Sequence, residues 1–247
     1  MHGITLRNII YGLLLLAGYN SAHAAISLSS TRLIFDEASK EASITSHNAG
    51  TQEILLQSWL EYENKAAKDI PFIITPTLAR LKADTRQVLR VLYLGTGMPH
   101  DKESVLWLNA QEIPQVTQEE NTLQIAVRQR IKVFYRPKGL KGSANDAPSL
   151  LTWQLGTQDQ KTYITLKNPT AYHVSMLSLE GITLSEAFTG KMFNPGESVV
   201  LPVEHLTNNQ TPTVLFKTIN DWGAQTPYKV RLDFNQPNTA SEVTEQP

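Results

Sequence analysis

The chain has 247 residues, 22 basic and 23 acidic side chains, a formal net charge of −1 and no cysteine. This charge balance provides no basic excess that would attract nucleic acid or an anionic membrane surface. The absence of cysteine excludes a disulfide scaffold, a thiol nucleophile and a cysteine-ligated metal, so the fold must be held by core packing. The length fits one large domain or two domains of ordinary size.

The N-terminal segment, residues 1–24, has the pattern of an export signal. Arg7 provides the positive charge, residues 9–17 form an apolar core, and Ala22-His23-Ala24 is a small-x-small cleavage site. The apolar core is too short to span a bilayer. We therefore expect cleavage after Ala24 and export from the cytoplasm, and a retained N-terminal anchor is the alternative interpretation.

The next part of the chain, residues 25–140, has the pattern of an all-β domain. Short runs of alternating apolar residues are separated by turn-forming residues such as Asn48-Ala49-Gly50, which is typical of a sandwich or barrel. No long 3.6-residue period is present, so few and short helices are expected. The expected strands cover Ile26–Phe35, Glu41–Ser46, Glu53–Tyr62, Gln87–Leu94, Ser104–Leu108 and Leu123–Tyr135.

The composition changes after Pro137. Residues 138–148 are polar and contain glycine, as a linker would, and a second strand-rich domain is expected over residues 145–235. Each domain has about the size of an immunoglobulin-like sandwich, roughly 100 residues, and the polar tail, residues 236–247, is expected to be disordered. The predicted fold is all-β, with two immunoglobulin-like β-sandwich domains in tandem and a hinge between them. The strands expected in the second domain are Leu151–Leu155, Thr162–Lys167, His173–Leu179, Ser198–Pro202, Val214–Ile219 and Tyr228–Phe234.

One expected strand, Leu123–Tyr135, is unusually long. Its run of about 13 residues exceeds the usual strand length of about 5–6. Its apolar alternation begins with Leu123, Ile125 and Val127 and continues to the domain junction. A strand of this length can extend beyond its own sheet and present a free edge, which proteins normally protect because it pairs with other chains. An edge left open would serve pairing with a partner, and it also predicts possible self-association of the chain.

The same segment resembles a known family. Residues 121–137 (NTLQIAVRQRIKVFYRP) are similar to the donor strand and hinge of the periplasmic pilus-assembly chaperones of the chaperone–usher pathway, the PapD-like family. The resemblance extends over nearly the whole chain after residue 24, and the segment 115–121 is similar to that of the family's short-loop class. Further motifs in the family's order are residues 25–35, 72–91, 103–114 (ESVLWLNAQEIP), 167–172 (KNPTAY) and 219–223 (INDWG).

The resemblance implies a chaperone without enzymatic activity in the periplasm of a Gram-negative bacterium. Its partners would be pilus or fimbrial subunits and an outer-membrane usher. It would lend residues 121–135 to a subunit that lacks its last strand, by donor-strand complementation, and Leu123, Ile125 and Val127 would fill the gap in the subunit. From the residues alone, the alternative is that these three side chains belong to the core of a central strand.

The resemblance also implies that two cations anchor the subunit. Arg32 and Lys132 fall at the positions where the family holds the C-terminal carboxylate of the subunit in the cleft between the domains. A carboxylate can accept hydrogen bonds from both, and this anchor would fix the register of the donated strand. From the pattern alone both are solvated surface cations, although Lys132 lies inside an apolar run.

A second charged set, formed by Glu103, Arg136 and Asp221, resembles the ionic link between the two domains of the family. Its expected role is to orient the domains and not to contact a ligand. An exposed ion pair contributes only about 0–1 kcal/mol to the stability of a protein. We therefore expect the link to set the orientation of the domains.

The sequence departs from the family pattern at two places. Thr75-Pro76-Thr77 contains one proline where relatives often have two in succession, so a cis peptide bond is not carried over from the family, and the sequence leaves the isomer of Pro76 open. Arg128 and Arg130 make the donor segment more basic than a purely apolar strand. Their charge would suit an acidic subunit or serve only solubility.

Two other functional classes remain as alternatives. An enzyme is disfavoured because the histidines have no metal-ligand spacing, no G-x-S-x-G motif is present, and Glu61 and Glu63 share one face of an expected strand. We therefore expect no cofactor, no metal and no small-molecule substrate. A two-domain immunoglobulin-like adhesin or structural surface-binding module would share the fold, but it would not need Arg32 and Lys132 beside an open edge.

Overall fold

The computed structural model describes residues 26–63, 69–115, 125–206 and 210–243. The predicted export signal, residues 1–24, and the predicted donor residue Leu123 lie outside these ranges. Within them, no helix is long and apolar enough to cross a membrane. The described elements are β-strands and a short 3-10 helix, η1 (Glu37–Ser39).

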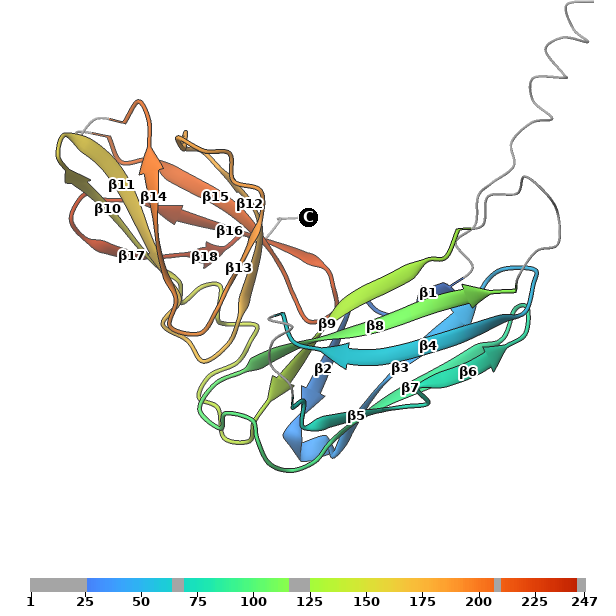
Figure 1. The fold of residues 1–247 in the computed structure, drawn as a ribbon. Coiled ribbons are helices and arrows are strands. Elements are labelled where there is room, and N and C mark those ends of the chain that lie inside the picture. The colour runs from blue at the N-terminus through green and yellow to red at the C-terminus, as the bar shows by residue number, and fades with distance from the viewer. Residues whose placement is uncertain (1–25, 64–68, 116–124, 207–209, 244–247) are drawn as a thin grey trace, which may run out of the picture.

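The first domain is a sandwich of two sheets (Figure 1). Its strands are β1 (Ile26–Leu28), β2 (Arg32–Asp36), β3 (Glu41–Asn48), β4 (Ile54–Glu61), β5 (Phe72–Thr75), β6 (Leu78–Leu81), β7 (Arg86–Tyr93), β8 (Ser104–Pro114) and β9 (Arg128–Arg136). One sheet has the order β1-β3-β7-β5 and the other has the order β2-β9-β8-β4-β6. Alternate side chains point into the core, as the pleat requires, and Phe35, Leu106, Val133 and Tyr135 are fully buried there.

The second domain is a separate sandwich with its own core. Its strands are β10 (Thr152–Gln158), β11 (Lys161–Lys167), β12 (Val174–Glu180), β13 (Lys191–Phe193), β14 (Ser198–Val203), β15 (Thr213–Ile219), β16 (Gln225–Arg231), β17 (Pro237–Thr239) and β18 (Ser241–Glu242). They form sheets of order β14-β11-β10-β17 and β13-β12-β15-β16-β18. The rings of Trp153 and Phe216 pack between the sheets with centroids 5.1 Å apart. The prediction of two tandem β-sandwich domains is confirmed.

The first expected strand, Ile26–Phe35, is in fact two strands in different sheets. β1 pairs antiparallel with β3, whereas β2 pairs parallel with β9. Between them the Ser30 hydroxyl donates to the carbonyl of Arg32 at 2.8 Å, a local side-chain bond that competes with strand pairing. The prediction of one continuous strand is therefore wrong, and the change of sheet brings Arg32 beside β9.

The prediction of one strand over residues 123–135 is wrong at its described beginning. β9 starts at Arg128, and Ile125–Val127 are not in a strand. The last backbone bond of this pairing runs from the Glu112 N–H to the carbonyl of Val127 at 2.9 Å. Continued in the same register, β8 would next present Pro114, its final residue, which has no N–H to donate. Ile125 and Ala126 therefore have no continuing ladder with β8.

One open point and one expectation concern smaller features. The Thr75–Pro76 peptide bond, whose isomer the sequence left open, is cis. The tail was expected to be disordered, but β17 pairs with β10 and β18 pairs with β16. Strands at a sheet edge are held by main-chain hydrogen bonds, so the polar composition of the tail did not reveal them.

Candidate functional site

Strand β9 lies at the junction of the two domains, between β8 and β2 (Figure 1). β8 pairs with its residues Arg128–Tyr135. β2 pairs only with Lys132–Arg136. In the described part of the chain, Arg128–Ile131 therefore have a strand partner on one side only. This half of β9 is an open edge able to accept another strand.

The predicted anchor residues Arg32 and Lys132 are brought together at the end of this edge. They are direct neighbours in the parallel pairing of β2 with β9, and both are half-buried. Burial lowers the pKa of each, and the charge of Arg32 lowers the pKa of Lys132 further. Within 4.0 Å, neither has a carboxylate partner among the described residues. Carboxylates act on them only from farther away, since the charges of Asp221 and Glu103 raise the pKa of Arg32 and the charge of Glu63 raises that of Lys132. Two partly desolvated cations without a direct ion-pair partner form a site suited to an anion.

The guanidinium of Arg32 is held in place by the second domain. Its Nη1 donates to the carbonyl of Ile219 at 3.1 Å, and its Cζ lies 5.5 Å from the centroid of the Phe134 ring. Its Nε is buried and has no hydrogen-bond partner among the described residues. Buried polar groups are normally satisfied, so this buried donor is an exception in the described part of the chain.

The predicted ionic link is assembled at the domain junction. Arg136 donates through Nε to Glu103 at 2.7 Å, and through Nη1 and Nη2 to the two carboxylate oxygens of Asp221 at 2.6 and 2.8 Å. Burial opposes the charge of Arg136, but the hydrogen bonds to Asp221 and the charge of Glu103 raise its pKa. The link joins the residue before β8 and the last residue of β9 to the β15–β16 loop of the second domain.

Glu103 is satisfied from both domains although its side chain is only 1% exposed. Besides Arg136, its carboxylate contacts the backbone N–H and the Nδ1 atom of His173, each at 2.8 Å. The Glu103 N–H donates to the carbonyl of Ala171 at 2.8 Å. His173 was not singled out from the sequence, because an isolated histidine without ligand spacing carries no signal of such a contact.

The loop between β15 and β16 presents Asp221 to the first domain. The Asn220 side chain accepts hydrogen bonds from the N–H groups of Trp222 and Ala224 at 3.1 and 3.0 Å, which closes the loop. Gly223 follows with a φ of +81°, and a Cβ there would lie 2.5 Å from the Thr31 hydroxyl. Only glycine suits both this conformation and this close approach.

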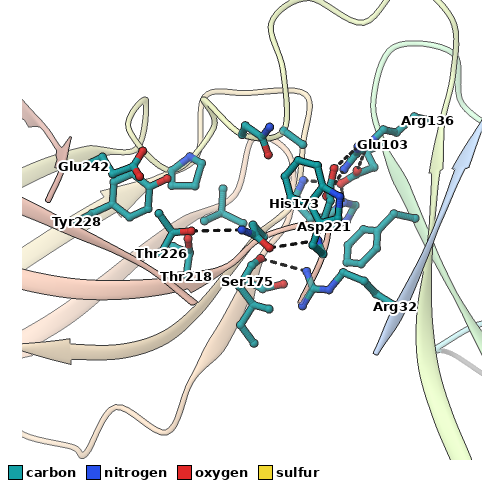
Figure 2. Close-up of a pocket in the computed structure, with 18 residues that line it drawn as sticks. Arg32, Glu103, Arg136, His173, Ser175, Thr218, Asp221, Thr226, Tyr228 and Glu242 are labelled. Atoms are coloured by element: carbon teal, nitrogen blue, oxygen red, sulfur yellow. Dashed lines mark hydrogen bonds and ion pairs between the residues drawn. The ribbon is translucent and has the colours of Figure 1, made fainter. Parts of the chain in front are cut away.

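A pocket of about 240 Å³ opens between the domains beside these charges. Figure 2 places Arg32 on the side of the first domain and Asp221 opposite it on the second. The polar side chains of Thr218, Thr226 and Tyr228 line the far end of the pocket. The end of the cavity next to β9 therefore combines the cations of Arg32 and Arg136 with the carboxylates of Glu103 and Asp221, and its far end carries polar side chains of β15 and β16 and the carboxylate of Glu242.

Sequence reasoning missed Phe134, which joins the anchor to the interdomain link. Its ring is buried, and it lies near Arg32 and in an edge-to-face contact with His173 at a centroid distance of 6.0 Å. The alternation along β9 could have identified it. Alternate residues of a strand share a face, so Phe134 lies on the same face as Lys132 and Arg136.

The predicted donor side chains are only partly described. Ile125 is 69% exposed, Val127 is half-buried, and Leu123 lies outside the described residues. The alternative interpretation places the Ile125 side chain in the core of a central strand, and its exposure argues against that interpretation.

The carboxylate pair considered for an enzyme is occupied by other contacts. Glu61 accepts from Arg130 Nε at 2.7 Å, and Glu63 accepts from the indole N–H of Trp107. The guanidinium of Arg130 also stacks 3.8 Å from the Trp107 ring centroid. These groups form one cation–aromatic network on the outer face of the sheet.

Family models and known proteins give a consistent result. Residues 25–141 match the model described as pili and flagellar-assembly chaperone, PapD N-terminal domain. Residues 146–230 match the model described as pili assembly chaperone PapD, C-terminal domain.

Among curated proteins, the chain is 34% identical over 226 residues to the probable fimbrial chaperone YadV of Escherichia coli K12, covering 86% of this chain and 92% of YadV. It is 37% identical over 215 residues to the chaperone protein LpfB of Salmonella typhimurium, covering 85% and 90%. The crystal structure of the YadV chaperone has a TM-score of 0.67 at 33% identity, covering 85% of this chain and all of that one. The periplasmic chaperone SfaE has a TM-score of 0.66 at 32% identity, covering 84% and 99%.

Proposed function

Because the chain belongs to the family of pili-assembly chaperones of the chaperone–usher pathway, we propose that it binds pilus subunits by lending them the edge of β9. This is a family of periplasmic chaperones in Gram-negative bacteria, and the chain is not an enzyme. The observation that carries the proposal is the half of β9 that has one strand partner among the described residues, next to two cations with no described carboxylate within 4.0 Å.

In the proposed complex, a subunit that lacks one strand pairs with Arg128–Ile131 and with the residues before them. Main-chain hydrogen bonds supply affinity, and alternate side chains enter the gap in the subunit core. Leu123, Ile125 and Val127 are the proposed donor side chains, and the exposure of Ile125 supports this role. Each of the three contributes about 1.5–3 kcal/mol by leaving water, before the cost of ordering.

The C-terminal carboxylate of the subunit is proposed to bind between Arg32 and Lys132. Each charge-assisted hydrogen bond contributes about 1.5–3 kcal/mol. The carboxylate also neutralises two cations that burial has partly desolvated. Fixing one end of the added strand sets its register, and a slip by one residue would turn the wrong side chains toward the subunit core.

The link of Arg136 with Glu103 and Asp221 is proposed to hold the second domain over this anchor. Without it, the carbonyl of Ile219 would not be kept at Arg32 and the pocket would lose its second wall. With its subunit bound in this way, the chaperone is proposed to deliver the subunit to the outer-membrane usher of the pathway.

The experiment compares the wild-type chain with Lys132→Ala in pull-downs from periplasmic extract of a host that makes pili. We expect small subunits to co-purify with the wild type and to be lost with Lys132→Ala. Lys217→Ala is the matched control, because Lys217 is an exposed cation on β15 that does not line the pocket. Circular dichroism establishes that each variant is folded. Equal capture by Lys132→Ala and the wild type, or no capture by the wild type, would contradict the proposal.

A further inference from the structure

Trp222 presents an exposed indole at the mouth of the cleft between the domains. It is 76% exposed, more than any other large apolar side chain among the described residues. It also lines the same pocket as Arg32 and Asp221. An exposed tryptophan is unfavourable in water, and aromatic residues in such positions are enriched where proteins bind partners.

The backbone that carries this indole is fixed on both sides. Before it, Asp221 is held by two hydrogen bonds from Arg136. After it, Gly223 packs against Thr31 of the first domain. The N–H of Trp222 itself is bound by the side chain of Asn220 at 3.1 Å. The ring is thus presented from an ordered loop, and a ligand that covers it pays little for ordering that loop.

The position of the loop relates the indole to the proposed anchor. The carbonyl of Ile219, at the start of this loop, accepts the hydrogen bond from Arg32 at 3.1 Å. Successive residues of an extended chain are spaced by about 3.3–3.6 Å. A chain whose terminal carboxylate binds Arg32 and Lys132 therefore places the side chains of its last residues within reach of the β15–β16 loop.

We propose that Trp222 is a specificity-determining contact that packs against a large apolar or aromatic side chain in the last two residues of the bound subunit. This inference rests on the carboxylate anchoring proposed above and adds a side-chain preference to it. The anchor recognises any free C-terminus, whereas the indole discriminates between C-termini. Subunits ending in small polar residues bind more weakly.

The test uses two synthetic peptides of alternating valine and threonine with N-terminal lysines and a free C-terminal carboxylate. They differ only in the last two residues, which are tyrosines in one and serines in the other. Their affinities for the wild type, Trp222→Ala, Trp222→Phe and Lys132→Ala are measured by calorimetry. Leu215→Ala is the matched control, because Leu215 is an exposed apolar residue of the same hairpin that does not line the pocket.

We expect Trp222→Ala to weaken binding of the tyrosine peptide about 30-fold, or about 2 kcal/mol at 1.4 kcal/mol per tenfold, the size of an interface hot spot. The serine peptide should change little, and Trp222→Phe should recover most of the loss. Equal binding of both peptides by the wild type and Trp222→Ala, with binding still lost in Lys132→Ala, would overturn the role of Trp222 alone. No binding of either peptide to the wild type would overturn the anchoring and this inference together.

Discussion

Replacing Asp221 with asparagine tests whether one charged contact holds the two domains in a fixed relation. Asp221 accepts two hydrogen bonds from the guanidinium of Arg136, at 2.6 and 2.8 Å. Asparagine keeps the shape of the side chain and one acceptor oxygen, but it removes the charge and one of the two acceptors. Both sandwich cores remain intact, because Asp221 lies in a loop outside them.

The loss in the free energy of unfolding caused by Asp221→Asn should lie between the values for a surface ion pair and a buried ion pair. The Arg136 and Asp221 side chains are 19% and 25% exposed, so the pair is neither fully buried nor on the surface. Surface pairs contribute about 0–1 kcal/mol, and breaking a buried pair costs about 3–5 kcal/mol. We therefore expect a loss of about 2 kcal/mol, which corresponds to a fall in Tm of about 8–16 °C if it acts on one domain of roughly 100 residues.

The assay combines differential scanning calorimetry with small-angle X-ray scattering of the subunit-free chain. We expect Asp221→Asn to lower the unfolding temperature of at least one domain and to broaden the distribution of distances between the domains. Glu53→Gln is the control, because it breaks an ion pair with Arg80, whose side chain is 74% exposed. That variant should change the free energy of unfolding by less than about 1 kcal/mol.

Two results would refute this reasoning. If Asp221→Asn melts like the wild type and gives the same scattering curve, the link does not couple the domains. If Glu53→Gln costs as much as Asp221→Asn, the loss reflects charge in general and not the position of Asp221.

Two further predictions concern the stability of the free chain. Lys132→Met should raise the Tm of the first domain by about 4–8 °C, about 1 kcal/mol for a domain of roughly 100 residues, while subunit capture is lost. The lowered pKa of Lys132 means that the folded chain binds this proton more weakly than the unfolded chain. The difference in Tm between Lys132→Met and the wild type should therefore become smaller as the pH rises toward the usual lysine pKa. A variant whose Tm near neutral pH is equal to or below that of the wild type would contradict this prediction. Deleting residues 236–247 should leave β10 and β16 as bare sheet edges and increase self-association of the chain. Identical sedimentation of the full chain and the shortened chain at high concentration would show that the tail does not protect these two strands.

The sandwich architecture was predictable because its cores are formed by alternating side chains. In β7, for example, Leu89 and Val91 are fully buried and Arg90 between them is exposed. This alternation is local and visible in the sequence. The break between β1 and β2 was not visible, because the apolar pattern continues across it while the chain changes sheet.

The residues of the cleft were suggested by their resemblance to family motifs and not by their chemistry. Arg32 and Lys132 read as surface cations until the parallel pairing of β2 with β9 places them side by side. Glu103 is 2% exposed, whereas a carboxylate is expected at the surface. Its burial depends on Arg136 and His173, which approach it from distant parts of the chain. Such non-local contacts have no local sequence signal.

The free chain combines three features that folded proteins usually avoid. Among the described residues, Arg32 and Lys132 are half-buried with no carboxylate within 4.0 Å, part of β9 has a strand partner on one side only, and Trp222 is exposed. Each has an unremarkable explanation when taken alone, since surface cations, sheet edges and exposed aromatic rings all occur singly. All three, however, lie around one junction between the domains, and the loop that carries Trp222 also contacts Arg32. A single ligand with a free carboxylate, an extended backbone and an apolar last side chain would neutralise the cations, pair with the open edge of β9 and cover the indole at the same time. This coincidence is the strongest physical reason to assign them to one bound subunit terminus.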